Sequence, residues 1–266
     1  MTPDLVAELL VRLVATATIV VGISLAVERL GPLVGGALVG LPIVVGPGFF
    51  FLIRNHTLTF SADAAASSLI SLCSTQAFLF VFCATAARAS PGATIIMASS
   101  AWFVMAMALS HMPTDPFLGL LLFTVAVFVA RRLGRRFVTP VSTPQTPGEL
   151  PLLIFRGVAA GILVAIATGL AKTLGAEWSG FIVTYPIGFT MISITLHQRF
   201  GASTAIATMY AATRGLASLA AFSFTLSTTI IALGPELAFT GALGAGIAVT
   251  SFLTWRSTVS VGRPAD

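Results

Sequence analysis

The chain has 266 residues, of which 56% are hydrophobic and only 9% carry a charged side chain, against roughly 25% charged residues in ordinary soluble domains. Its mean hydropathy is +0.99. This composition excludes a water-soluble globular protein. Apolar stretches of about 20 residues, the length at which a helix crosses a hydrocarbon core, recur along the whole sequence. We therefore expect an integral membrane protein with no separate soluble domain.

The formal net charge is +5, but the charge pattern does not indicate a nucleic-acid partner. The basic residues are almost all arginines in short segments between apolar runs, without a basic face or an aromatic platform. We interpret this charge as setting the topology in the membrane. The N-terminus, from Met1 to Asp4, lacks the basic region and cleavage site of a signal peptide, so the first apolar run is expected to remain as a helix.

In chain order, apolar runs bounded by charged residues, Gly or Pro predict nine membrane-spanning helices. The long run from 202 to 232 must tilt or kink to fit a bilayer, and if it formed two short helices the total would be ten. The predicted spans cover residues 8–29, 32–53, 63–86, 92–111, 116–132, 152–174, 178–196, 202–232 and 235–255.

A polar linker divides the chain near its middle, where four arginines between 131 and 136 precede a Pro/Thr/Ser-rich stretch. We expect a first transmembrane repeat of five helices at 1–137, a cytoplasmic linker at 138–151 and a second repeat of four or five helices at 152–266. Basic residues favour the cytoplasmic side. With nine helices the N-terminus is then external, the C-terminus is cytoplasmic, and the residues expected inside are Arg29, Arg88, Arg131, Arg132, Arg135, Arg136, Arg156, Arg199, Arg256 and Arg263, with Arg12, Arg54 and Lys172 outside.

The two halves share a pattern of Leu, Gly and Pro. Leu30-Gly31, Gly36, Pro42 and Leu52 recur at a constant offset as Leu174-Gly175, Gly180, Pro186 and Leu196. A matched Leu-Gly, Gly and mid-helix Pro indicates an internal duplication. Because the first half holds an odd number of spans, the second half enters the bilayer from the opposite side. This predicts two repeats of inverted topology, an arrangement found in secondary transporters.

Prolines and glycines interrupt the second span around Pro42 and Gly46, and its counterpart is interrupted from Tyr185 and Pro186 to Gly188 and Thr190. An interrupted helix frees backbone carbonyls that protein, water or ligand must satisfy in lipid. Paired interrupted helices point to a substrate site, so we predict that these residues bind substrate. The alternative is close helix packing, which small residues such as the pairs Gly36/Gly40 and Gly157/Gly161 also allow.

Arg214 is the most distinctive single residue, because it lies about 20 Å along a helix that starts after Gly201. A central arginine is costly in a bilayer, by about 2.5 to 17 kcal/mol depending on the estimate, and should face the bundle interior with a partner. The acidic residues all fall at predicted span ends or in loops. The remaining possibilities are contact with an anionic ligand, a tie to backbone carbonyls or a hydroxyl, and snorkelling to the interface.

The third span carries a polar stripe that we expect to face a cavity. The stripe holds Ser67, Ser71, Ser74 and Thr75 at helical spacing with Gln76 beside them. Of these residues, Ser74 and Gln76 are predicted to bind substrate. Serine and threonine can equally bond to carbonyls of their own helix. No catalytic triad, metal-binding helix motif or phosphate-binding loop occurs, so we expect neither an enzyme nor a bound metal or cofactor.

The pattern from Leu30-Gly31-Pro32 through Gly40-Leu41-Pro42 to Gly46-Pro47, repeated in part from Leu174-Gly175 to Pro186, resembles a group of uncharacterised bacterial inner-membrane proteins. Members look like two-repeat transporters and are named only as hypothetical membrane proteins. The resemblance implies a bacterial inner membrane. A more distant likeness is to inverted-repeat carriers such as sodium/proton antiporters and bile-acid symporters, which have intramembrane acidic groups that this sequence lacks.

These observations favour a secondary transporter for an anionic small molecule, held between the Pro42 and Pro186 interruptions with Arg214 and Gln76 lining the cavity. One alternative is a translocase for lipids or lipid-linked precursors, in which the arginine meets a phosphate head group. The other is a non-catalytic membrane subunit whose Gly/Ala faces dock a partner. The expected partners are membrane lipids and the substrate.

Overall fold

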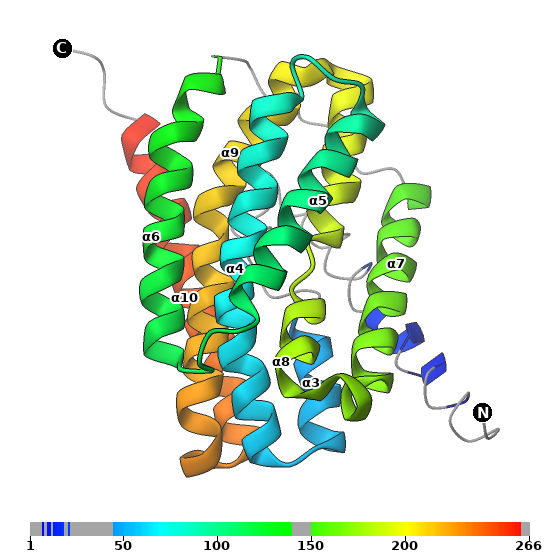
Figure 1. The fold of residues 1–266 in the computed structure, drawn as a ribbon, viewed down its shortest axis with the longest axis vertical. Helices are drawn as coiled ribbons and strands as arrows, with labels where there is room; N and C mark the ends of the chain where they lie inside the picture. The colour runs from blue at the N-terminus through cyan, green and yellow to red at the C-terminus, as the bar shows by residue number, and fades with distance from the viewer. Residues whose placement is uncertain are drawn as a thin grey trace.

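The computed structural model describes residues 45–139 and 150–261, together with scattered positions between residues 7 and 21. Within these residues every element is helical, and the helices form one elongated bundle (Figure 1). The elements are α3 (Val45–Asn55), α4 (Leu58–Thr85), α5 (Pro91–Leu109), α6 (Pro116–Gly134), the short 3-10 helix η1 (Arg135–Phe137), α7 (Leu150–Gly169), α8 (Ala171–Val183), α9 (Ile187–Leu233) and α10 (Pro235–Val261).

Several helix starts follow directly from local sequence. The Thr57 hydroxyl accepts a hydrogen bond from a backbone N–H in the first turn of α4, and Ser90 and Asp115 do the same for α5 and α6. Such side chains satisfy N–H groups that have no partner within the helix. In α5 and α6 a proline follows the cap, where its fixed φ suits the first helical position.

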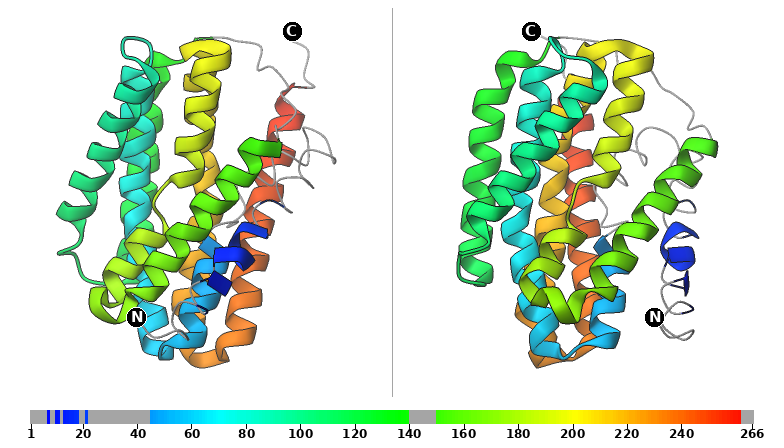
Figure 2. Two further views of the ribbon diagram at one scale, coloured as in Figure 1. Left: turned by 90° about the vertical axis from the view of Figure 1, so that its right-hand side faces the viewer. Right: turned by 45° about the vertical axis from the view of Figure 1, so that its right-hand side comes forward.

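The helix α9 consists of two parts joined at Gly201, which has φ 81° and ψ 169°. This positive φ suits glycine because it has no Cβ. The chain turns at one end of the bundle between the two parts and at the other end before α10 (Figure 2). After Gly201 the helix continues without a break to Leu233, so the division of residues 202–232 into two short helices is wrong.

Within residues 45–139 and 150–261, five helical stretches are long and apolar enough to cross a membrane, and the protein is an all-α, multi-pass membrane protein. One of them, Thr173–Leu233, contains the turn at Gly201 and therefore folds back on itself. The five stretches are Leu58–Thr85, Pro91–Leu109, Pro116–Phe137, Thr173–Leu233 and Pro235–Leu253.

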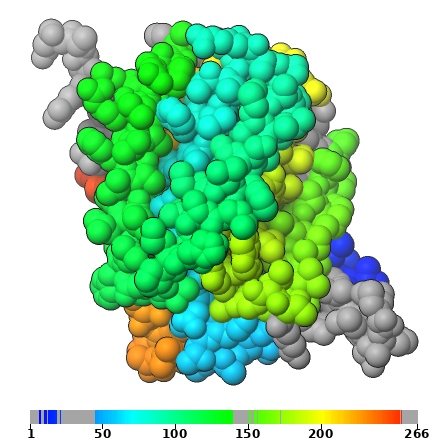
Figure 3. Space-filling view, in the orientation of Figure 1, coloured from blue at the N-terminus to red at the C-terminus, as the bar shows by residue number. Residues whose placement is uncertain are grey.

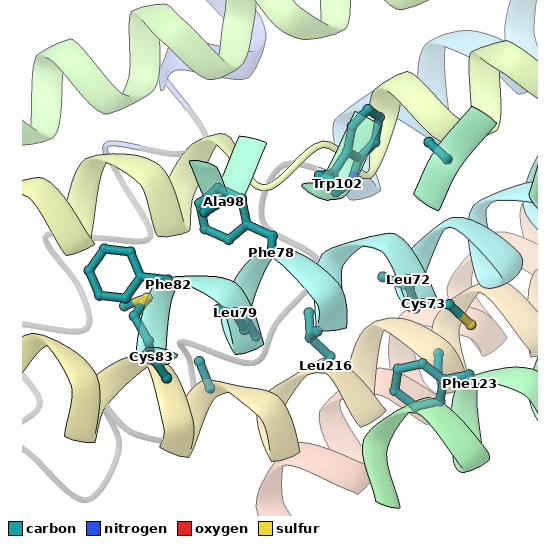
Figure 4. Close-up of a cluster of buried hydrophobic side chains, with 14 of the residues drawn as sticks. Leu72, Cys73, Phe78, Leu79, Phe82, Cys83, Ala98, Trp102, Phe123 and Leu216 are labelled. Carbon is teal, nitrogen blue, oxygen red and sulfur yellow. The ribbon is translucent and has the colours of Figure 1, made fainter. Parts of the chain in front are cut away.

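The helix α4 is the centre of the bundle, because α5, α6, α8 and α9 all pack against it. Phe78 of α4 points toward Ala98 of α5, and Leu79 of α4 lies beside Leu216 of α9 (Figure 4). Phe123 of α6 belongs to the same hydrophobic cluster. In lipid, such contacts hold helices together by close packing rather than by exclusion of water. The polar side chains in the middle of α4, from Ser67 to Gln76, are therefore enclosed by protein.

Glycines allow two very close helix contacts. A Cβ at Gly180 of α8 would collide with the backbone carbonyl of Ala64 in α4. On α7, a Cβ at Gly161 or Gly157 would meet backbone atoms of Leu13 and Ala17. The packing role considered for the Gly157/Gly161 pair is thus confirmed. Gly36 and Gly40 lie outside the described residues.

One predicted boundary was wrong. The helix α4 begins at Leu58 instead of residue 63, because Asp63 is an exposed residue inside the helix and does not end it. The element α8 is kinked at Gly175, with φ 77° and ψ 173°, which lies in the predicted gap between residues 174 and 178, and Glu177 belongs to the helical part after this kink. The predicted linker lies mostly outside the described residues, which resume at Leu150.

Candidate functional site

The chain leaves the helical conformation between α8 and α9, at Thr184, Tyr185 and Pro186. Pro186 has no N–H to donate, and a proline disfavours helical geometry in the residue before it. The interruption predicted at this proline is therefore present. Its first-half counterpart at Pro42 lies outside the described residues.

Part of the polar backbone at this break is satisfied locally. The Thr184 hydroxyl is within hydrogen-bonding distance of the Gly180 carbonyl, at 3.1 Å, and of the Phe181 carbonyl, at 2.9 Å. The Thr190 hydroxyl donates to the Pro186 carbonyl at 3.0 Å. Thr190, predicted to bind substrate, thus already uses its proton within its own helix. Beside Gly188 the space is open, since a Cβ there would meet nothing within 4 Å.

The central helix supplies further donors to the break. The Thr75 hydroxyl donates to the Thr184 carbonyl at 3.3 Å, and the Ser71 hydroxyl lies 3.5 Å from the Phe181 carbonyl. Thr184 follows the last residue of α8, so its carbonyl receives no N–H from a further helical turn, whereas the Phe181 carbonyl also accepts the Thr184 backbone N–H at 3.2 Å. Ser71 and Thr75 thus do not follow the alternative of bonding to carbonyls of their own helix, and they join α4 to the interrupted helix.

An aromatic group from α5 covers the other side of the break. The Tyr185 hydroxyl lies 3.0 Å from the Ser99 hydroxyl. The Trp102 ring packs edge-on against the Tyr185 ring, with centroids 5.0 Å apart and an interplanar angle of 85°. Trp102 is the aromatic residue drawn beside the thin non-helical stretch in Figure 4. Its indole N–H is buried and has no hydrogen-bond partner.

The polar stripe of α4 holds three buried oxygen atoms without a partner, the hydroxyls of Ser67 and Ser74 and the side-chain Oε1 of Gln76. All three side chains are at most 1% exposed. A buried polar atom without a hydrogen bond costs about 1 to 3 kcal/mol and calls for an explanation. Ser68, by contrast, is fully satisfied by the Ala65 carbonyl and the Ser223 hydroxyl, each at 2.8 Å.

A second polar group connects α4, α6 and α9. The Gln76 Nε2 donates to the Thr213 carbonyl at 3.0 Å, and the Thr213 hydroxyl accepts a hydrogen bond from Arg131 Nη1 at 3.1 Å. The Arg131 guanidinium also lies over the Tyr210 ring, 4.7 Å from its centroid, while the Tyr210 hydroxyl donates to the Arg131 carbonyl. Arg131 is thereby held in place by α9.

The position of the Arg214 side chain differs from the one expected. Its side chain is exposed, where an interior position with a partner was expected, and it lies close enough to Arg131 for the two positive charges to interact. Gln76 reaches the backbone at the neighbouring Thr213 and not the Arg214 side chain. The expected cavity lined jointly by Arg214 and Gln76 is thus not formed by the residues that the structure describes.

Sequence reasoning missed Arg131 as a site residue, because the arginine cluster was taken to be a cytoplasmic linker. The structure continues α6 through Arg131 and Arg132 to Gly134. A helical pattern that extends past the apolar run could have indicated this. Gly46 lies in the first turn of α3, where a Cβ would come 3.8 Å from the Leu243 side chain of α10, which is ordinary packing.

Glu177 is a further residue that the sequence did not single out. It lies inside α8, is partly buried, and has one carboxylate oxygen without a hydrogen-bond partner. His111 lies close enough for an electrostatic interaction with it. Among the described residues, no group of three or more His, Cys, Asp or Glu side chains could hold a metal ion.

An apolar hollow of about 180 Å³ lies between α4, α5 and α6, with Cys73, Gln76 and Phe80 at its base and Met105, Val129 and Leu133 at its rim. The three rim residues are exposed. Figure 3 shows α5 and α6 side by side on this face, with part of α4 visible between them. Gln76 therefore lies between the hollow on one side and Thr213 on the other.

The described site offers hydroxyl, amide, carbonyl and guanidinium groups, with two arginines brought together from α6 and α9. These groups bind polar or anionic molecules by hydrogen bonds and charge. Thr75 and Gln76 are neighbours on α4 and connect the break to the arginine group. Comparison of the chain with protein-family models, with curated proteins and with solved structures finds no match.

Proposed function

We propose that the protein is a secondary transporter of the bacterial inner membrane that moves an anionic small molecule through a central site at the helix break. The observation that carries the proposal is the interruption at Thr184–Pro186, which faces a buried polar stripe with two unpartnered hydroxyls, those of Ser67 and Ser74. Interrupted helices near the middle of a bundle are a common way to build transport sites in membranes. Unpartnered donors beside such a break are available to a substrate.

We further propose that the two halves are inverted repeats with an external N-terminus and a cytoplasmic C-terminus. In support, α3 as described runs from Val45 to Asn55, and the first part of α9, which begins directly after Pro186, covers the corresponding residues of the second half. Both short helices lead into long ones, α4 and the second part of α9, and these two pack against each other. Inverted repeats can exchange conformations and so open a site to either side.

The preference for an anion rests on the groups around the site. The side chains that bond to the break or line it with an aromatic ring are hydroxyl and aromatic groups, and Glu177, the one acid of α8, lies seven residues before Thr184. Arg131 and Arg214 bring positive charge to the adjacent face of α9, and among the described residues the groups whose charge acts on Arg131 are Arg214 and Tyr210. An anion gains from such surroundings, whereas a cation is repelled.

Cysteine accessibility tests the transport proposal without knowledge of the substrate. Cys73 and Cys83 are both free and buried, so a background with both changed to Ala is the starting point. Single cysteines are then introduced as Ser67→Cys and Ser68→Cys, at adjacent positions of equal burial. A membrane-impermeant thiol reagent is applied to right-side-out and to inside-out vesicles.

For a transporter we expect Ser67→Cys to react from both sides of the membrane, because alternating access exposes the central site to each in turn. Ser68→Cys is the matched control and should stay unreactive, since Ser68 is enclosed between α4 and α9 by its bond to Ser223. If Ser67→Cys reacts from neither side, the transport proposal fails and a subunit that docks a partner becomes the better explanation.

A translocase for lipids or lipid-linked precursors is the second candidate, favoured by the exposed position of Arg214. A head group could reach an arginine on the outside of the bundle, which an enclosed arginine would not permit. Reconstituted vesicles with fluorescent phospholipids discriminate the two candidates. Protein-dependent loss of leaflet asymmetry supports the lipid candidate, and unchanged asymmetry together with two-sided Ser67→Cys labelling supports a soluble substrate.

A further inference from the structure

Arg131 is held at a defined position on the side of α9. Its guanidinium donates to the Thr213 hydroxyl at 3.1 Å and stacks over Tyr210, whose hydroxyl donates to the Arg131 carbonyl at 3.1 Å. The Thr213 hydroxyl in turn donates to the Tyr210 carbonyl at 2.7 Å, which orients its lone pairs toward Arg131. A long side chain with three contacts loses much of its freedom before any ligand arrives.

Arg131 lies beside a like charge. It bonds to Thr213, the residue directly before Arg214, at 3.1 Å, and the Arg214 charge acts on it. Two like charges repel, more strongly as they approach and as water is excluded. The contacts that hold Arg131 near Arg214 therefore act against this repulsion. An anion bound between the two guanidinium groups would be attracted by both of them.

We propose that Arg131 and Arg214 together form an oxyanion-binding site, in which the two guanidinium groups hold one phosphate-type or carboxylate-type group. A guanidinium presents parallel N–H donors that match two oxygens of such a group, and charge-assisted bonds of this kind are about twice as strong as neutral ones. One guanidinium comes from α6 and the other from α9, so the bound group bridges two helices. The Thr213 hydroxyl acts as a positioning residue for Arg131.

The oxyanion site would name the substrate class of the proposed transporter. Only the claim that the bound anion is transported rests on the proposed function. Gln76 joins the two regions, because it donates to the Thr213 carbonyl while its neighbour Thr75 donates to the Thr184 carbonyl at the break. The ligand chemistry is an oxyanion in either of two forms, a soluble ion or the phosphate of a membrane lipid. Both can reach the exposed Arg214 side chain.

Binding of inorganic phosphate to the purified full chain in a neutral detergent is measured by calorimetry and by thermal shift, at constant ionic strength because salt screens surface charges. A parallel arm compares the melting temperature in nanodiscs of phosphatidylglycerol and of phosphatidylcholine. The variants are Arg131→Gln, Arg214→Gln and Thr213→Val. Arg132→Gln is the matched control, because it removes one positive charge from the exposed face of the same helical turn.

We expect Arg131→Gln and Arg214→Gln each to weaken binding at least tenfold, and the double variant to lose little more, because both residues serve one ligand. Thr213→Val keeps both charges and should weaken binding by a smaller factor, about three- to fivefold, through the loss of one positioning hydrogen bond. Arg132→Gln should bind as the unchanged protein does. Phosphate binding identifies a soluble ligand, and stabilisation by phosphatidylglycerol alone identifies a lipid head group.

The proposal is overturned if neither probe binds, or if Arg132→Gln weakens binding as much as Arg131→Gln, since that pattern reflects general surface charge. Should Arg131→Gln fail to fold, Arg214→Gln decides alone, because the exposed Arg214 side chain can be shortened without disturbing the core. Thiol labelling at Ser67→Cys reports on alternating access independently. Loss of the oxyanion site with intact two-sided labelling refutes the site and leaves the transport proposal standing.

Discussion

The unpartnered hydroxyl of Ser74 leads to an unusual prediction, that its removal stabilises the protein. Ser74 is fully buried and its hydroxyl has no hydrogen-bond partner. Replacing it with alanine removes an atom whose desolvation costs about 1 to 3 kcal/mol, and alanine is also the better helix former. We expect Ser74→Ala to gain about 1 to 3 kcal/mol, which corresponds to a rise of several degrees in the melting temperature.

Ser68→Ala is the matched control for this experiment, because it makes the same chemical change six residues earlier in α4. Ser68 has two hydrogen bonds, to the Ala65 carbonyl and the Ser223 hydroxyl. Its loss should cost about 1 kcal/mol and leave the Ser223 hydroxyl unpaired. Thermal unfolding in detergent, followed by circular dichroism, measures both variants. Equal destabilisation by Ser74→Ala would refute the reasoning, since Ser74 would then have a partner.

Two further substitutions test the helix contacts around the break. Gly180→Ala should strongly destabilise the protein, by about 3 kcal/mol or more, because its Cβ would meet the Ala64 backbone, whereas the matched change Gly188→Ala enters open space and should alter the melting temperature little. Equal effects of the two would contradict the close contact. Tyr185→Phe should cost about 1 kcal/mol by removing the hydrogen bond to Ser99, and an unchanged melting temperature would show that water replaces this bond.

Features governed by nearby residues could be predicted from the sequence. Pro186 predicted the break between α8 and α9, because a proline acts on its own turn of helix. Gly201, between two apolar runs, marked the turn inside α9. Asp63 misled the prediction of the start of α4, because a single charge can lie at the exposed surface of a helix without ending it.

The candidate site was predicted less well because it depends on contacts between distant residues. The contact of Arg131 with Thr213 joins residues 82 positions apart, and no local pattern shows which helix lies beside α6. The free-energy cost of placing Arg214 in lipid led to the prediction of an interior position. That cost shows that an arginine avoids the hydrocarbon, but it does not show on which face of the helix the arginine lies. Gln76, predicted to line a cavity with Arg214, is buried and lies beside the apolar hollow between α4, α5 and α6.

The break and the turn at Gly201 also have a mechanical consequence. Gly180 lies so close to the Ala64 carbonyl that the part of α8 after the kink at Gly175 has little room to rotate against α4. The segment of α9 from Ile187 to Gly201 is different, because non-helical residues flank it at both ends. This short helical segment can change its tilt by backbone rotation at the non-helical residues on either side, while the hydrogen bonds within the segment stay intact.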